Sequence, residues 1–355
     1  MESMVVIEFW KNRRVLITGH TGFKGGWLSL LLQKLGAEVF GYALKSDTTP
    51  SLFLQAELSN YCHHTIADVQ DFKSMQKCVL SVQPHIIFHL AAQSLVRRSY
   101  SEPLETWRTN VLGTANLLES LKLLNNRCAG VIVTTDKVYE NREWHYAYRE
   151  TDAIGGHDPY SASKASAELA LASWRSSFFN LSGSKVRLAS ARAGNVIGGG
   201  DWSKDRIVPD MVRHLNDETA IPVRNPNAMR PWQHVLEPLK GYLLLAEQLY
   251  KSDDAELQSA FNFGPGSSSI RTVKNLVEEG LKHWPGRWDN LAQNDAPHEA
   301  EILKLTSAKA RFLLEWKPRW DFEQAVRYTI DWYRRSHQGE PAVQLMNEQI
   351  DGYLS

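Results

Sequence analysis

The stretch RVLITGHTGFKG, residues 14–25, decides the fold of this chain. Its apolar, β-branched first half predicts a buried strand, and its second half places Gly19, Gly22 and Gly25 before an apolar helix over Trp27–Leu32. At such a junction, glycines provide a tight turn, close approach of the backbone to a pyrophosphate, and close helix-to-strand packing. The pattern predicts a dinucleotide-binding loop, although its spacing is GxxGxxG and a structural turn would also fit these letters.

The residues on either side of this loop alternate between short β-branched runs and longer helical patterns. The predicted strands are Arg14–Thr18, Glu38–Tyr42, Tyr61–Ile66, His85–Leu90, Gly130–Thr135 and Lys185–Ala191. The predicted helices are Gly26–Leu35, Phe72–Val82, Leu104–Leu124 and Pro159–Phe178. Six strands with intervening helices predict an α/β fold, a doubly wound parallel sheet of the Rossmann type.

The chain of 355 residues is longer than a single core usually allows, so we expect two lobes. The composition changes near Gly198, where GGGDWSKDR is glycine-rich and polar. We therefore expect an NAD-binding domain over 1–197 and a smaller substrate-binding lobe over 198–355. An apolar helix over Leu239–Leu249 and a strand over Phe261–Gly264 are expected to return to the first domain, within 233–264.

Composition excludes several classes of partner. Forty Lys and Arg balance forty Asp and Glu, so no net field draws the chain to nucleic acid or to an anionic membrane. Cys62, Cys78 and Cys128 are scattered and lack metal-ligand spacing, which argues against a disulfide framework or a metal site. The N-terminal stretch and the later apolar runs lack the patterns of a signal peptide or a membrane span. We expect a soluble, cytoplasmic, metal-free protein.

Two strand ends after the glycine loop suit the rest of a dinucleotide. Asp47 lies about 20 residues past the loop, where a carboxylate binds the ribose of NAD. Lys45 would instead meet the 2′-phosphate of NADP. Asp68 closes the third strand, where its carboxylate would either accept a hydrogen bond from adenine or cap the following helix. The sequence favours NAD over NADP.

The segment DPYSASK begins a helix and places Tyr160 and Lys164 one turn apart on the same face. An ammonium stabilises a nearby phenolate. We therefore expect Lys164, with an oxidised nicotinamide, to lower the pKa of Tyr160 from about 10 towards the working pH. Tyr160 would then be the base for an alcohol proton. A lone YxxxK is common by chance and would be a surface pair, but here it follows the fifth strand.

The fifth predicted strand ends in TTDK. Because the carboxyl ends of parallel strands face the ligand crevice, we expect Thr134, Thr135, Asp136 and Lys137 to face it too. A hydroxyl there would orient the reacting alcohol beside Tyr160. A simple alcohol dehydrogenase needs no further acid or base, so Asp136 and Lys137 indicate elimination chemistry, unless this pair is only a solvated turn.

Several motifs resemble those of one known family. GHTGFKG, HLAAQS at His89–Ser94, NVLGT at Asn110–Thr114 and YSASK are similar to motifs of the extended short-chain dehydrogenase/reductase family. TTDKVYENREW, SARAGNVIGGGDWSKDRIVPD at Ser190–Asp210 and MRPWQHVLEPLKGYL at Met229–Leu243 resemble, within that family, the CDP-glucose 4,6-dehydratases. The resemblance covers nearly the whole chain.

The resemblance implies that NAD stays bound and is used twice on a nucleotide-linked hexose, CDP-glucose. Tyr160 would deprotonate the sugar 4-hydroxyl while Thr135 hydrogen-bonds it, and hydride would pass from C4 to the nicotinamide. Loss of the C5 proton and of the C6 hydroxyl as water, with Asp136 as acid, would precede return of the hydride to C6. The product would be a nucleotide-linked 4-keto-6-deoxy sugar for deoxysugar biosynthesis.

The resemblance, together with the motifs and the strand ends, implies the binding residues. The cofactor is assigned to Gly19, His20, Gly22, Phe23, Gly25, Asp47, Asp68, Ala91, Ala92, Asn110, Tyr160 and Lys164. The nucleotide sugar is assigned to Gln93, Ser94, Asn195, Lys204, Arg206 and Arg230. Arginine forks suit diphosphate oxygens, although each cation would equally suit a surface ion pair.

Two residues depart from the pattern of the family. Lys137 stands where the wider dehydratases place a glutamate that removes the C5 proton. An ammonium is no base, so either Lys137 loses its proton or another group acts. His20 replaces a small residue, and its ring beside the pyrophosphate would either donate a hydrogen bond or loosen the cofactor.

Other functions and the assembly stay open. A nucleotide-sugar 4-epimerase needs neither Asp136 nor Lys137, a non-catalytic dinucleotide sensor would keep only the glycine loop, and cytosine is assigned by resemblance alone. Leu104–Leu124 and Pro159–Phe178 resemble the helices that build the dimer of this family, although their apolar faces would equally be buried on their own sheet. We expect a homodimer or a dimer of dimers.

Overall fold

A seven-stranded parallel sheet forms the centre of the computed structural model, which describes residues 8–181, 183–291 and 303–355. The strand order is β11-β6-β5-β4-β1-β2-β3, and every neighbouring pair is parallel. The strands are β1 Arg14–Thr18, β2 Glu38–Ala43, β3 His63–Ile66, β4 Ile86–His89, β5 Cys128–Val133, β6 Val186–Arg192 and β11 Ala260–Asn262. The order reverses beside β1, so β1 and β4 flank the crevice where such sheets bind ligands. The predicted doubly wound fold is confirmed.

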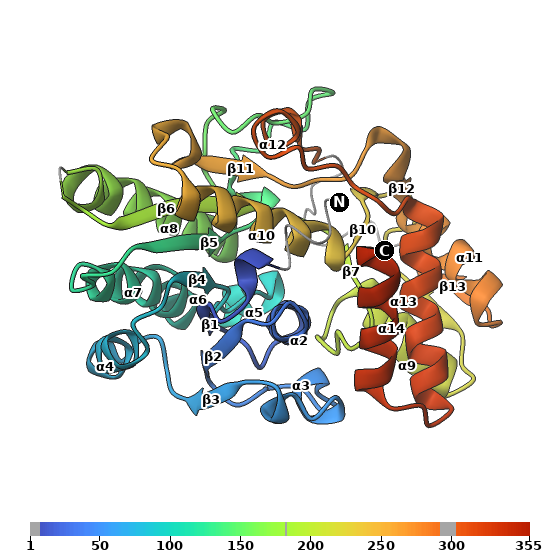
Figure 1. The fold of residues 1–355 in the computed structure, drawn as a ribbon. Helices are drawn as coiled ribbons and strands as arrows, with labels where there is room; N and C mark the ends of the chain where they lie inside the picture. The colour runs from blue at the N-terminus through green and yellow to red at the C-terminus, as the bar shows by residue number, and fades with distance from the viewer. Residues whose placement is uncertain (1–7, 182, 292–302) are drawn as a thin grey trace.

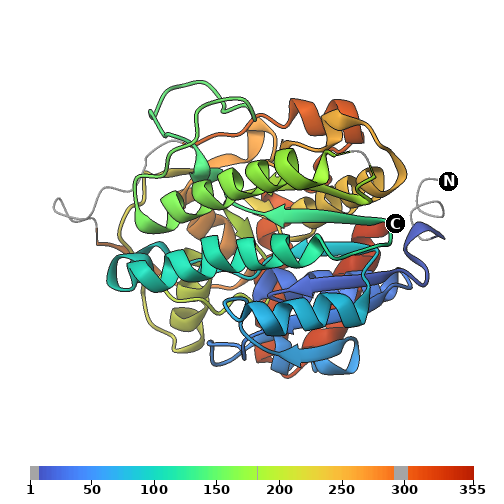
Figure 2. The same ribbon diagram turned by 90° about the vertical axis from the view of Figure 1, so that its left-hand side faces the viewer.

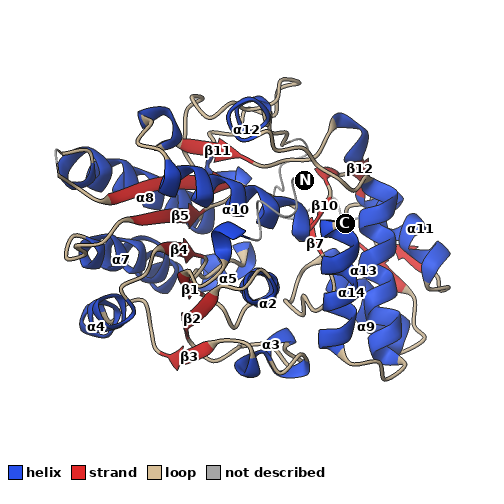
Figure 3. Cartoon of the chain, viewed as in Figure 1, coloured by secondary structure: helices blue, strands red, loops and turns tan. Residues whose placement is uncertain are grey.

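Helices cover both faces of this sheet, as Figures 1 and 3 show. The helices α4 (Phe72–Val82), α7 (Gly113–Leu121) and α8 (Pro159–Trp174) lie on one face, and α2 (Phe23–Lys34) and α10 (Leu236–Lys251) lie on the other. β1 and α4 have the predicted bounds, and the other five predicted strands differ from the observed ones by one or two residues at their ends. Apart from the edge strand β3, whose residues are exposed, the apolar, β-branched residues of these strands are mostly buried from both sides, which is why the runs are continuous rather than alternating.

The second lobe packs against the face that carries α2 and α10. Its helices are α9 (Ile207–Asn216), α11 (Val273–His283), α13 (Phe322–His337) and α14 (Ala342–Leu354). Trp27, Trp316 and Trp332 are fully buried in one apolar cluster that runs from the sheet into this lobe. The two lobes therefore share a core, which fixes the position of the lobe over the sheet.

Two segments beyond residue 233 return to the sheet. β11 adds a parallel seventh strand beside β6, with Phe261 opposite Ala191, and α10 packs on β5 and β6. The predicted strand Phe261–Gly264 lies one to two residues too late, because Gly264 already leaves the ladder.

Two long helical rods lie side by side on the outer face of the sheet (Figure 2). α6 (Pro103–Trp107) continues through a π-helical turn at Arg108–Leu112 into α7, and α8 ends in a second π-helical turn at Arg175–Phe179. Proline at the first position of α6 and α8 suits a helix start, where its missing N–H costs nothing. The predicted helix over Leu104–Leu124 is thus one rod with a wider turn in its middle.

Within the residues that the structure describes, no helix is both long enough and apolar enough to cross a bilayer. Cys62, Cys78 and Cys128 are free thiols.

Three buried histidines make the stability of the fold depend on pH. Burial lowers the pKa of His20 to about 4 and the pKa values of His89 and His234 to about 3. In the unfolded chain these rings bind protons below about pH 6.5. Between about pH 6.5 and 4 the unfolded state therefore holds more protons than the folded state, and the free energy of unfolding decreases as the pH is lowered. We expect each histidine to contribute a loss of about 2 kcal/mol between pH 7 and 5.

Urea unfolding at pH 7 and pH 5 measures this loss. His89→Gln should lose less stability over that range than the wild type, because one titrating ring is gone, and His145→Gln should lose as much, since His145 is exposed. Equal losses in all three proteins would contradict the assignment.

Candidate active site

The glycine loop between β1 and α2 is shaped by contacts that exclude side chains. Gly19 has φ +79°, and a Cβ there would lie 2.7 Å from the backbone nitrogen of Ala91. A Cβ on Gly25 would overlap the carbonyl oxygen of Gly19 and lie 2.7 Å from the Cα of His20. At Gly22 the nearest atom would be 3.4 Å away, so the loop itself has room there. Gly19 and Gly25 are thus required by the fold, and Gly22 is open towards a ligand.

This loop fits the pyrophosphate of a dinucleotide. Gly22 is the N-cap of α2 and provides no side-chain cap, so the first-turn N–H groups keep the anion-binding character of a helix N-terminus. The small residue Ala91 packs against Gly19 at the end of β4, and Phe23 packs against Gly198 of the second lobe. The residues present suit a nicotinamide dinucleotide laid across the ends of β1 and β4.

The ring of His20 points away from this cradle, into the protein. His20 is buried, its Nε2 is 2.9 Å from His64 Nδ1, and its ring stands edge-on to Phe53. It fills the space left by Gly41, where a Cβ would overlap the ring. The expectation that this ring would lie beside the pyrophosphate is not met, because β2, β3 and the helix at Leu52–Gln55 enclose it.

Tyr42, Asp47 and Asp68 lie where the ribose and adenine end of a dinucleotide is expected, and their contacts are all within the protein. The hydroxyl of Tyr42 donates to the backbone oxygen of Asp68 (2.8 Å), and Asp68 Oδ1 accepts from the N–H of Gln70 (2.9 Å). Asp71, not Asp68, is the N-cap of α4, so the helix-cap interpretation of Asp68 is wrong. Asp47 is exposed and lies 3.3 Å from Arg98 Nη1. Asp47 is therefore free to meet a ribose only if it leaves this weak ion pair.

Tyr160 and Lys164 lie on the first turns of α8, which Asp158 caps by accepting from the N–H of Ser161 (2.9 Å). Lys164 Nζ donates to the backbone oxygen of Val133 (3.0 Å), and burial lowers its pKa to about 8. Burial raises the pKa of Tyr160 to about 12, partly offset by a hydrogen bond with Thr135. The expected fall is for a site that also holds an oxidised nicotinamide; in the protein alone, burial of the phenol outweighs the effect of its neighbours.

Asp136 lies beside this pair, in a short 3-10 turn after β5. Its Oδ1 accepts from the hydroxyl of Thr135 (3.0 Å) and its Oδ2 accepts from Asn195 Nδ2 (3.2 Å). Gly194 makes room for it, since a Cβ there would overlap the carboxylate. Thr135, Asp136, Tyr160 and Asn195 therefore converge as the strand ends predict.

The other two residues of the TTDK motif behave differently. Thr134 turns to the opposite side of β5 and donates to Glu168 Oε1 (2.6 Å), because successive residues of an extended chain point to opposite sides. The expectation that Thr134 faces the crevice is wrong. Lys137 is half-buried, and its N–H donates to Thr135 Oγ1 (3.3 Å).

Gln93 and Asn110 hold the loop after β4 through hydrogen bonds within the protein. Gln93 is buried, its Oε1 accepts from the N–H of Leu95 (2.6 Å) and its Nε2 donates to Thr106 Oγ1 (2.9 Å). Asn110, in the π-helical turn, donates to the backbone oxygen of Gln93 (3.0 Å) and to Ser163 Oγ of α8 (2.9 Å). The side chain of Gln93 is thus engaged within the protein, while Ala92 and the exposed Ser94 lie at the loop surface.

The three predicted cations of the second lobe differ in their partners and in their exposure. Arg206 lies 2.8 Å from Asp201 Oδ2, with its Nη2 3.4 Å from the hydroxyl of Ser94. Arg206 thereby joins the second lobe to the loop after β4. Lys204 is exposed, and Arg230 in β9 (Met229–Pro231) donates to the backbone oxygen of Met229 (2.9 Å).

Lys24, inside the glycine loop, is a residue that the sequence reasoning missed. Burial and the charge of Arg206 lower its pKa to about 8, while Asp136 and Asp201 raise it. The same ammonium lowers the pKa of Lys164. Among the described residues, no hydrogen bond or ion pair of the Lys24 ammonium is present. The pattern GxxGxKG could have pointed to Lys24, because a cation is unfavourable at a helix N-terminus unless it has another role.

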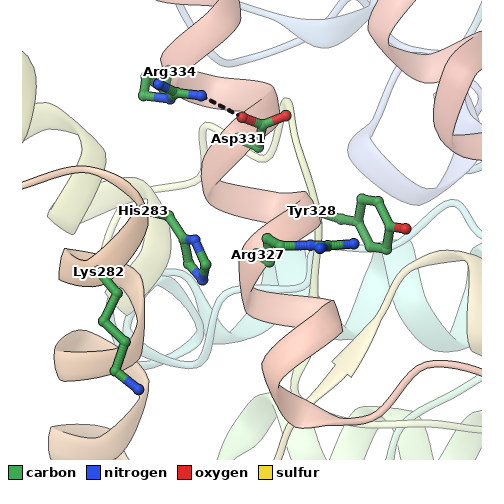
Figure 4. Close-up of a pocket in the computed structure, with 6 residues that line it drawn as sticks. All are labelled: Lys282, His283, Arg327, Tyr328, Asp331 and Arg334. Atoms are coloured by element: carbon green, nitrogen blue, oxygen red, sulfur yellow. Dashed lines mark hydrogen bonds and ion pairs between the residues drawn. The ribbon is translucent and has the colours of Figure 1, made fainter.

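A separate hollow of about 460 Å³ lies between α11 and α13 (Figure 4). It is lined by Lys282, His283, Arg327, Tyr328, Asp331 and Arg334. Two of its cations are paired, Lys282 with Glu279 and Arg334 with Asp331. None of the predicted site residues lines it, so it is not part of the candidate active site.

Comparisons with known proteins agree with this geometry. Residues 16–329 match the family model described as GDP-mannose 4,6 dehydratase. The chain is 44% identical over 357 residues to a CDP-glucose 4,6-dehydratase of Salmonella typhimurium, with 99% of each chain covered. A Bacillus anthracis structure of dTDP-glucose 4,6-dehydratase with NAD superposes with a TM-score of 0.75 at 20% identity, covering 91% of this chain and 97% of that one. A UDP-glucose 4-epimerase of Thermotoga maritima superposes with a TM-score of 0.79 at 20% identity, covering 91% of this chain and 99% of that one.

Proposed function

This chain belongs to the GDP-mannose 4,6-dehydratase family, a branch of the extended short-chain dehydrogenases/reductases, and from that membership we propose that it dehydrates CDP-glucose to CDP-4-keto-6-deoxyglucose. The observation that carries the proposal is the convergence of Tyr160, Thr135 and Asp136 at the strand ends beside the glycine loop. The choice of CDP-glucose rests on the end-to-end likeness to the Salmonella enzyme.

The cofactor is NAD, which supplies a reversible hydride acceptor when bound. The backbone of the glycine loop binds its pyrophosphate at the N-terminus of α2. Asp68 binds the adenine end and Asp47 the ribose. Ala91, Ala92 and Asn110 form the wall at the end of β4, with Tyr160 and Lys164 beside the nicotinamide.

Tyr160 removes the proton of the sugar 4-hydroxyl as hydride leaves C4. The Thr135 hydroxyl, which is hydrogen-bonded to the phenol, orients the substrate oxygen. Burial raises the pKa of Tyr160, so the positive charges of Lys164 and of a nicotinamide ring are needed to stabilise the phenolate. Lys164, held by the oxygen of Val133, is fixed in place for this task.

Asp136 donates a proton to the C6 hydroxyl, which leaves as water after the C5 proton is removed. Thr135 and Asn195 each donate to one carboxylate oxygen of Asp136 and so fix its orientation. With NAD bound, hydride would then return to C6 and a proton to C5, so that the oxidation state of the cofactor would be unchanged over one cycle.

Lys24 is the amine that accepts the C5 proton, in preference to Lys137. Its ammonium is unpaired among the described residues and lies near Asp136, and its pKa of about 8 leaves a usable fraction of free amine at neutral pH. We expect Lys24→Met to keep bound NAD and C4 oxidation but to lose about 10²-fold or more in deuterium exchange at C5. Lys137→Met should keep that exchange.

Deuterium incorporation from heavy water, read by mass spectrometry, compares the two variants. Exchange lost in Lys137→Met and kept in Lys24→Met would assign the base to Lys137. Loss of bound NAD in Lys24→Met would show a cofactor ligand instead of a base.

The diphosphate of the nucleotide is bound by Arg206 and Arg230, with Lys204 at the rim and Ser94 and Asn195 on the sugar side. Arg206 is already oriented by Asp201 and lies in reach of the Ser94 hydroxyl, which supports this placement. Its fork suits two phosphate oxygens at once.

The outer helical rods form a homodimer, and two dimers are able to pair. Leu104, Leu112 and Leu169 lie on these rods and are all more than half exposed, which supports an apolar contact between copies. Sedimentation velocity of the purified chain tests it, since a monomer at micromolar concentration would contradict the dimer.

The activity is tested with NAD-loaded protein against CDP-, dTDP-, GDP- and UDP-hexoses. We expect loss of water and a 4-keto product from CDP-glucose only. A 4-epimer without loss of water would identify an epimerase, and no turnover in either the wild type or Tyr160→Phe would favour a non-catalytic sensor.

A further inference from the structure

A buried carboxylate lies directly behind the candidate active site. Glu168 is on α8, one turn after Lys164, and is almost fully buried. Its Oε1 accepts from Thr134 Oγ1 (2.6 Å) on the strand end that continues to Thr135. Its Oε2 accepts from Ser190 Oγ (3.0 Å) on β6. One side chain thus joins the helix of the catalytic tyrosine to the strand of the catalytic threonine.

Arg192 completes this connection. It meets Glu168 through two parallel hydrogen bonds, Nε to Oε1 (2.8 Å) and Nη2 to Oε2 (2.5 Å). Its Nη1 donates to the hydroxyl of Tyr139 (2.7 Å), which donates to Asn262 Oδ1 of β11 (2.7 Å). Bidentate geometry of this kind restricts rotation of both partners. The network therefore fixes α8, the segment after β5, β6 and β11 relative to one another.

The carboxylate also acts on Lys164 through its charge. Burial lowers the pKa of Lys164, Lys24 from α2 lowers it further, and Glu168 raises it. On the sheet side Lys164 faces the oxygen of Val133 and the buried ring of His89, whose pKa it lowers. Glu168 is the only carboxylate among the groups that shift the pKa of Lys164 in the described part of the chain.

We propose that Glu168 is a positioning residue for the dehydration: through Thr134 and Arg192 it orients α8 so that Tyr160 and Lys164 face Thr135. The proposal rests on the proposed function of the site. Glu168 is shielded from the crevice by β5 and α8, so it contacts neither substrate nor cofactor.

Thr134→Val and Ser190→Ala form a matched pair. Each removes one hydrogen bond from a hydroxyl to Glu168, but only Thr134 precedes a catalytic residue. We expect both variants to lower Tm by a similar few degrees. We expect Thr134→Val to lose about tenfold in kcat, because a small displacement of a reacting group is costly, with bound NAD unchanged. Ser190→Ala should stay within about twofold of the wild type.

Glu168→Gln tests the effect of the charge without substrate. Labelling of Lys164 by an amine reagent, followed by mass spectrometry across a pH series, reports its pKa in the NAD-loaded protein. We expect a lower pKa in Glu168→Gln than in the wild type, and no change in Ser190→Ala.

Equal losses of kcat in Thr134→Val and Ser190→Ala would overturn the positioning role, and an unshifted Lys164 in Glu168→Gln would overturn the effect of the charge. Should Glu168→Gln not fold, the matched pair decides alone. A wild-type chain that does not turn over CDP-glucose would contradict the proposed function, while the labelling result would still stand.

Discussion

Substitution of Tyr160 by phenylalanine is expected to lower kcat by about 10³-fold, the scale of losing a positioned acid–base group. The phenol is the group that takes the 4-hydroxyl proton, and it is hydrogen-bonded to Thr135, whose own hydroxyl donates to Asp136. The ring itself is buried beside Lys164, so phenylalanine fills the same volume. Bound NAD and Tm should therefore change little. Single-turnover absorbance of reduced nicotinamide measures the loss at the first step.

Tyr242→Phe is the matched control. Tyr242 on α10 is also fully buried, and its hydroxyl has no hydrogen-bond partner among the described residues. Its removal should leave both activity and stability near those of the wild type. Reduction of NAD at the wild-type rate in Tyr160→Phe would remove Tyr160 from the mechanism.

The second large effect is expected at Gly25. An alanine Cβ there overlaps the carbonyl oxygen of Gly19 and approaches the Cα of His20, and both of these are backbone atoms that no side-chain rotation can move away. The loop must move, which costs about 3 kcal/mol or more, at the upper end for overpacking. We expect Gly25→Ala to lower the free energy of unfolding by that amount and to lose bound NAD.

Gly22→Ala distinguishes an effect on folding stability from an effect on NAD binding. A Cβ there meets only the Gly19 oxygen at 3.4 Å, so urea unfolding should show stability within about 1 kcal/mol of the wild type. NAD affinity should nevertheless fall at least tenfold, because the methyl group enters the space of the pyrophosphate. Unchanged NAD affinity in Gly22→Ala, measured by calorimetry, would show that the dinucleotide does not lie on this loop.

Local patterns predicted much of the fold. The run Arg14–Thr18 and the helix Phe72–Val82 have the predicted bounds, because apolar periodicity and flanking turn residues act within a few residues of the chain. The seventh strand was expected only as a returning segment near Phe261. Its pairing with β6 depends on a crossover through the second lobe.

The sequence predicted which residues lie at the site better than it predicted where their side chains point. Thr135, Asp136 and Tyr160 meet as expected, since the carboxyl ends of parallel strands share one edge of the sheet. Thr134 and Gln93 point elsewhere, because hydrogen-bond partners from distant segments, Glu168 and Thr106, satisfy them. A buried polar group turns to its partner, and that partner is not visible from the local sequence.

The sequence by itself determined the glycine loop, the doubly wound sheet and the residues of the catalytic pair. These depend on backbone conformation and on spacings of three or four residues. Only the tertiary structure decided where His20 points, that the Lys24 ammonium lies within electrostatic reach of Asp136, and that Glu168 and Arg192 support α8. Each of these depends on burial and on charges brought together from distant parts of the chain. Packing decides how deeply a group is buried and which charges lie near it, and neither can be read from neighbouring residues in the sequence.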